Sequence, residues 1–154
     1  MGLAAAGPRM RAEVSIRDGI SAELERIQDI PGALTTLAMI AAQVLVERAV
    51  GAFTRTNLRP SPWPERKDDK PHPLLQLSKA LSQSLTAQAE SNGAIIGSDR
   101  PYAAVHQLGS TKKNIPARPF FAFDADGTID PAADRLVQAA LRAGIAQIIG
   151  RGAV

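Results

Sequence analysis

The sequence predicts an α+β domain in which three to four helices pack on a small antiparallel sheet, with long loops between these elements. Apolar side chains recur at helical spacing over residues 33–53 and 136–149. Ser-Asn-Gly at 91–93 lies between two short segments that can form strands, and prolines crowd residues 54–73. A chain of 154 residues can bury its own core, so we expect one domain over residues 1–154.

The first third of the chain is expected to form a short strand and two helices. Residues 12–18 alternate weakly, and residues 20–27 place three aliphatic side chains on one helical face. Proline and glycine at 31–32 end that helix. The next helix, residues 33–53, is apolar on nearly every side. A short chain cannot easily enclose such a helix, so we expect part of it to face a second copy.

A long surface loop, expected to be mobile, is predicted over residues 54–73. The segment contains five of the eleven prolines and eight charged residues. Proline fixes φ and removes a hydrogen-bond donor, so we expect no regular element there. Trp63, the only tryptophan, lies in the middle of this loop. We expect Trp63 either to hold the loop against the domain or to contact a partner.

The middle of the chain is expected to hold a short helix, a hairpin and one further strand. Leucines over residues 74–81 predict two to three helical turns. Asn-Gly, a strong hairpin signal, predicts that residues 86–90 pair with residues 94–97. Three phenylalanines over residues 120–123 predict another strand, after a corner made by Pro116 and Pro119.

The C-terminal segment predicts an amphipathic helix. Asp130 is suited to cap the helix, and Pro131 is suited to its first position. Apolar side chains at helical spacing then continue to about Gly150.

Residues 97–123 form the most distinctive part of the sequence. A Gly-Ser pair at 97–98 is followed by YAAVHQLG over residues 102–109, a basic polar loop, and IPARPF over residues 115–120. The octet is expected to form either a short helix or a bent strand that ends at Gly109, where glycine permits a left-handed turn.

This order of segments resembles the phage virion morphogenesis family, also called tail-completion proteins. The family includes the S-type proteins of P2-like phages and the G-type proteins of Mu-like phages. Its pattern is a Gly-Ser strand end, then Y-A-x-x-H-Q-x-G, then I-P-A-R-P-F. Phe53, the Pro62-Trp63-Pro64 turn and the leucine-rich residues 75–85 extend the resemblance to roughly residues 50–130.

The resemblance implies a structural phage or prophage protein of tail completion or head–tail joining, which acts by ring-like assembly and not by catalysis. Its implied partners are further copies of itself and other tail or neck proteins, with a transient contact to packaged DNA left open. It implies a location in the host cytoplasm during assembly and then in the tail or neck of the virion. Tail tip, tail terminator and neck are not distinguished by the sequence.

The charge is concentrated in one segment. Residues 98–118 hold Asp99 as their only acidic group and four basic residues, so they account for the net charge of +3. Such a segment is either a solvated loop or a surface for nucleic acid or an acidic partner. Residues 109–115 contain no acidic group and no apolar side chain before Ile115, so we expect this loop to be exposed and mobile.

Seven residues are candidates for assembly contacts. Arg118 is expected to hold the 109–117 loop to the domain, to cross to another subunit, or to contact DNA. His106 is expected to form hydrogen bonds within its turn rather than to act as a base. The full set is Trp63, Tyr102, His106, Lys112, Lys113, Arg118 and Phe120.

A basic nucleic-acid-binding accessory protein is the alternative function. Such proteins usually carry a larger basic face or an identifiable motif, and neither is evident in this sequence. Binding of DNA at about 150 mM salt that weakens as salt rises would distinguish this alternative.

No enzyme, metal or cofactor is expected. The chain has no cysteine, and neither His72 nor His106 stands in a catalytic or metal-binding pattern. Asp124 and Asp126 resemble the start of a calcium loop, but Arg135 occupies the position of the last acidic ligand.

No membrane segment or signal peptide is expected either. The longest uncharged run, residues 31–46, is shorter than the ~20 apolar residues that a membrane helix requires. The N-terminus lacks a basic region followed by a long apolar core.

Overall fold

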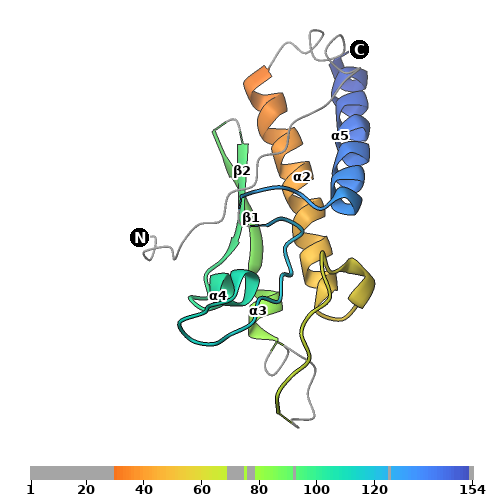
Figure 1. The fold of residues 1–154 in the computed structure, drawn as a ribbon. Coiled ribbons are helices and arrows are strands. Elements are labelled where there is room, and N and C mark those ends of the chain that lie inside the picture. The colour runs from red at the N-terminus through yellow and green to blue at the C-terminus, as the bar shows by residue number, and fades with distance from the viewer. Residues whose placement is uncertain (1–29, 69–74, 76–78, 92, 125, 153–154) are drawn as a thin grey trace.

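The computed structural model describes residues 30–68, 75, 79–91, 93–124 and 126–152. In this part of the chain, four α-helices pack on a two-stranded antiparallel sheet, which confirms the predicted α+β class (Figure 1). The predicted strand 12–18 and helix 20–27 lie outside the described residues. The elements are α2 (Ile30–Ala52), η1 (Thr56–Leu58), α3 (Ala80–Gln83), β1 (Leu85–Glu90), β2 (Gly93–Ser98), α4 (Ala103–Leu108) and α5 (Pro131–Gly152).

Helix α2 lies between the hairpin and α5 and contacts both (Figure 1). Leu37, Ala41 and Leu45 of α2 pack with a buried aliphatic face of α5. The two helices approach closely at Gly144, where an added Cβ would lie 2.7 Å from Ile40 Cδ1. The apolar side chains whose spacing predicted this helix are therefore the ones that pack against α5.

The side of α2 away from the core keeps apolar residues at the surface. Leu34 and Val50 are exposed in this copy of the chain. Among the described residues, Gly32–Ala52 is also the one helix with the length and mean hydropathy (1.5) compatible with a membrane span. A third of the most apolar window in that stretch is buried inside the domain. The expectation that α2 also faces a second copy remains a prediction.

The hairpin forms as predicted. β1 and β2 pair antiparallel from Leu85↔Ser98 to Glu90↔Gly93. The helix predicted over residues 74–81 is wrong where the structure describes it, because α3 is a single turn. Leu75 and Lys79 have positive φ values of 60° and 57°, and a helix cannot continue through that backbone conformation.

The loop that follows α2 contains a short helical turn, and the predicted mobility of this loop stays a prediction. The 3-10 turn η1 lies inside the segment that was predicted to hold no regular element, so that part of the prediction is wrong. Arg59 Nε donates to the carbonyl of Ala52 (2.8 Å), which ties this turn back to the end of α2. Residues 69–73 of the predicted loop lie outside the described part of the chain.

Helix α5 begins and ends close to its predicted limits. Asp130 Oδ2 accepts a hydrogen bond from Ala133 N (3.2 Å), and Pro131 occupies the first helical position. Proline is favourable there because its missing N–H has no partner within the first turn of a helix.

Candidate functional site

The short helix α4 is joined to the core by the side chain of Gln107. Its Nε2 donates to the carbonyls of Phe121 and Phe123, both at 3.0 Å. Its Oε1 accepts hydrogen bonds from the backbone N–H groups of Phe120 (3.0 Å) and Phe121 (2.9 Å). The residue is only 2% exposed, so it satisfies four backbone hydrogen bonds away from water.

This arrangement corrects the strand predicted over residues 120–123. The segment is buried, but its backbone pairs with the amide of Gln107 where a strand would pair with another strand. Among the described residues, this segment forms one isolated β-bridge, between Phe123 and Ile129. His106 was among the predicted site residues and Gln107 was not. A glutamine on the apolar face of a short helix is the sequence feature that could have indicated a buried amide.

Residues 109–117 form a tight turn that leaves α4 at Gly109. Gly109 has φ of 75°, and a Cβ there would lie 2.8 Å from Ala117 N. Ser110 and Ile115 exchange two backbone hydrogen bonds of 2.8 and 2.9 Å across the base of the turn. Lys112 and Lys113 stand exposed at its tip, as predicted. The mobility of this turn stays a prediction.

Arg118 joins this region to the loop that follows α2. Its Nε donates to the carbonyl of Pro64 (3.1 Å), and its Nη2 donates to the carbonyl of Glu65 (3.2 Å). Its backbone N–H donates to the carbonyl of His106 (2.7 Å). The guanidinium therefore holds residues 64–65 beside the end of α4, whereas the sequence suggested that it would hold the 109–117 turn.

Trp63 also holds that loop against the domain, which is the first of its two predicted roles. Its Nε1 donates to the carbonyl of Pro119 (2.7 Å), and its ring meets Phe53 edge-on. The guanidinium of Arg59 lies 3.7 Å from the centre of the indole ring, a cation–π arrangement. Trp63 and Phe120 are both buried in this core, so neither offers its side chain to a partner in this structure.

Tyr102, at the N-cap of α4, lies one turn before His106. Their rings meet edge-on, with centroids 5.9 Å apart, and Tyr102 is 40% exposed. Burial, together with the positive charge of Arg118, lowers the pKa of His106 below 6.5. His106 Nδ1 is buried and has no hydrogen-bond partner among the described residues. The imidazole is therefore neutral at pH 7 and is half-buried.

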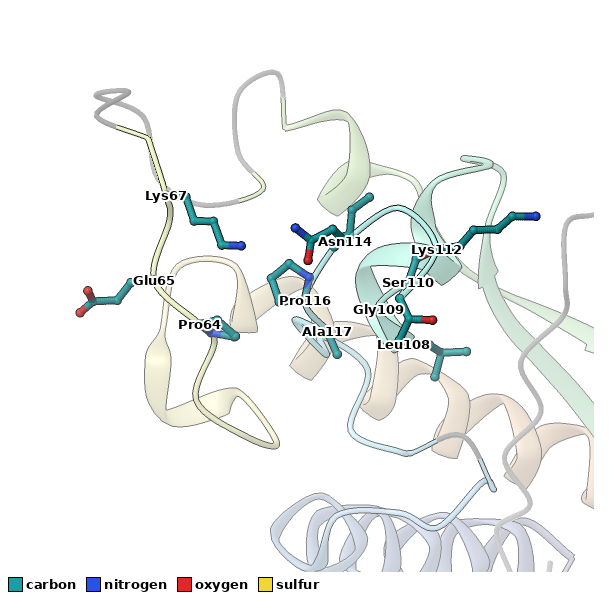
Figure 2. A pocket seen from close by; sticks show the side chains of 12 residues that line it. Pro64, Glu65, Lys67, Leu108, Gly109, Ser110, Lys112, Asn114, Pro116 and Ala117 are labelled. Atoms are coloured by element: carbon teal, nitrogen blue, oxygen red, sulfur yellow. The ribbon is translucent and has the colours of Figure 1, made fainter.

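A groove of about 650 Å³ lies between the two segments that Arg118 joins. In Figure 2, Lys67 extends across this groove toward Asn114, Glu65 points away from it, and Lys112 projects outward on the far side of the turn. Leu108, at the end of α4, contributes to the lining and is 44% exposed. The lining residues are Pro64, Glu65, Lys67, Leu108, Gly109, Ser110, Thr111, Lys112, Asn114, Ile115, Pro116 and Ala117.

The groove thus brings together residues that the sequence had placed in two separate loops. Lys112 lines the groove, and Lys113 follows it in sequence. Tyr102 is exposed at the N-cap of α4, and Arg118 donates hydrogen bonds to the carbonyls of Pro64 and Glu65 in the lining. Lys67 was not among the predicted site residues, because its position opposite the turn depends on contacts between distant parts of the chain. Within the residues that the structure describes, no group of three or more acidic or histidine side chains is placed to hold a metal ion.

The fold and the groove define a small α+β protein with exposed lysines beside a surface groove. Residues 17–139 match the phage virion morphogenesis family, and the chain belongs to that family. It therefore has a structural role in building a phage particle.

Two relatives are similar to this chain. The Mu-like prophage FluMu G protein 2 of Haemophilus influenzae is 34% identical over 115 residues, which cover 66% of this chain and 82% of the relative. The putative capsid assembly protein G of Escherichia phage Mu is 35% identical over 88 residues, which cover 52% of this chain and 56% of that relative. No solved structure matches the chain.

Proposed function

We propose that this protein acts in tail completion or head–tail joining, by assembling with further copies of itself into a ring that contacts other tail or neck proteins. It would do so in the host cytoplasm and then remain in the tail or neck of the particle. Family membership supports the general role, and the name of the phage Mu relative, a putative capsid assembly protein, supports a part in assembly.

The observation that carries the proposal is the basic turn beside the groove. The base of the turn is fixed by Gly109 and the Ser110–Ile115 hydrogen bonds, while Lys112 and Lys113 at the tip are exposed. A turn whose base is already held by hydrogen bonds has less backbone freedom to lose when a partner docks at its tip. The turn and groove are therefore suited to contact another protein.

The test is deletion of the gene from a lysogen that releases particles, followed by electron microscopy of the lysate. We expect heads and tails that are not joined, or tails of abnormal length, and we expect a plasmid copy of the gene to restore complete particles. Complete, infectious particles without the gene product would contradict the proposal.

A further inference from the structure

The chain carries an acidic surface in addition to its basic groove. Residues 124–134 contain four aspartates and no basic residue. Asp124 and Asp126 are exposed, and both accept a hydrogen bond from the backbone N–H of Thr128, at 3.0 and 2.8 Å. Gly127, the residue before Thr128, has a φ of 87°.

The carboxylate of Asp126 is ionised at neutral pH. Hydrogen bonding with the Asp124 side chain and with Thr128 lowers the pKa of Asp126 to about 2. Neither Asp124 nor Asp126 forms an ion pair with any described residue. The acidic turn, residues 124–128, therefore presents negative charge that this copy of the chain leaves without a cationic partner in the described structure.

The lysines at the groove also lack an ion-pair partner among the described residues. Lys67, Lys112 and Lys113 are exposed, and none forms an ion pair with a described residue. The acidic turn is not part of the groove lining within one copy. Figure 1 places α4 and its following turn at one end of the molecule, while α5, which begins just after the acidic turn, extends toward the other end.

We propose that the acidic turn of one copy docks against the basic rim of the groove of the next copy. The two charged surfaces are complementary and separate on one chain, so the contact is head-to-tail. Repetition of such a contact closes into a ring when the rotation between copies permits closure. The inference rests on the proposed function and identifies the contact through which the ring forms.

Exposed apolar side chains accompany both charged surfaces. Leu108 lines the groove, and Tyr102 is exposed on the same helix. On the acidic side, Leu136 is 49% exposed, about 9 Å along the axis of α5 from its capping residue Asp130. Surface ion pairs alone contribute little free energy, so burial of these apolar groups is needed for a lasting contact. The charges then select the partner surface and speed association.

The first test reverses the charges. Lys112→Glu/Lys113→Glu and Asp124→Lys/Asp126→Lys should each weaken self-association by about tenfold or more, measured by sedimentation, because like charges then face each other. All four substitutions in one chain should restore association. The matched control is Arg142→Glu/Arg151→Glu, which makes the same charge change at exposed positions of α5 away from both surfaces. Circular dichroism melting checks that each variant folds.

The second test detects weak contacts. Isotope-labelled and unlabelled copies are mixed, and a carbodiimide joins lysines to carboxylates that touch. We expect cross-links that join Lys112 or Lys113 of an unlabelled copy to Asp124 or Asp126 of a labelled copy, or the reverse. Links within one copy only, or no effect of either charge reversal on association, would overturn the inference.

Particle assembly distinguishes this inference from the function on which it rests. If Lys112→Glu/Lys113→Glu abolishes complementation of the deletion while Asp124→Lys/Asp126→Lys complements fully, the groove takes another virion protein. The inference then fails and the proposed function stands. If particles form normally without the gene, the proposed function fails as well.

Discussion

Gln107 shows how one side chain can take the place of a strand. Its amide meets four backbone groups of residues 120–123, and the surrounding aromatic side chains exclude water from these hydrogen bonds. A buried hydrogen bond contributes modestly when made, but an unmade one leaves the full desolvation cost of the group. The stability of the aromatic core and the position of α4 therefore depend on the same residue.

Replacement of Gln107 by alanine should be strongly destabilising. It leaves two backbone N–H groups and two carbonyls without their partner, and we expect a loss of about 3 kcal/mol or more in the free energy of unfolding. Urea denaturation measures the loss. Gln88→Ala, at an exposed position of β1, is the control and should change stability by less than about 0.5 kcal/mol. A loss for Gln107→Ala as small as that of the control would contradict this role.

His106 should make stability depend on pH. Its folded pKa is lowered from 6.5 by burial and by Arg118, so above pH 6.5 neither the folded nor the unfolded state gains a proton there. Between 6.5 and the lower folded value, the unfolded chain binds a proton that the folded chain does not. Stability is therefore lost as pH falls through that window, and below it this group adds no further change.

The pH contribution is measured by comparing urea denaturation of the parent and His106→Gln from pH 8 to pH 5. Only the parent should show the loss that begins near pH 6.5, because glutamine does not titrate. A parent that becomes relatively more stable than the variant as pH falls would show that the imidazole is stabilised in its charged form.

At the scale of the elements, the turn after α4 depends on the backbone conformation of Gly109. Gly109→Ala places a Cβ 2.8 Å from Ala117 N at a φ of 75°, so both the clash and the strained backbone oppose folding. We expect a loss of about 1–3 kcal/mol in urea denaturation. Gly97→Ala in β2 is the matched control, since its Cβ would meet nothing within 4 Å. Equal stability of the two variants would show that the turn can relax without cost.

The sequence predicted those elements whose signals are local. The apolar period of α2, the Asn-Gly turn of the hairpin, and the Asp130-Pro131 start of α5 each act within a few residues. The strand over 120–123 was predicted wrongly because its partner is a side chain 13 to 16 residues away. The groove could not be predicted as a unit, since Arg118 joins it through carbonyls more than 50 residues distant in sequence.

At the scale of the whole molecule, the described chain separates its core from the groove. α2, the hairpin and α5 pack together, while α4 and the two loops of the groove lie toward one end (Figure 1). Aromatic side chains that the sequence placed among the contacts, Trp63 and Phe120, serve the core. Tyr102, Leu108 and the lysines at the groove are exposed instead.

The net charge of +3 sets how the whole protein should behave toward DNA, and so separates the structural role from a nucleic-acid-binding one. Lys67, Lys112 and Lys113 can make only two or three phosphate contacts, and we expect little binding of duplex DNA at about 150 mM salt. Lys112→Glu/Lys113→Glu should melt like the parent, because exposed charges contribute little to stability. A fluorescence titration with labelled duplex measures the affinity. If the parent binds duplex DNA with sub-micromolar affinity and the double variant does not, the basic groove is a DNA site. The partner of the lysines would then be a polyanion and not the acidic turn of a neighbouring copy.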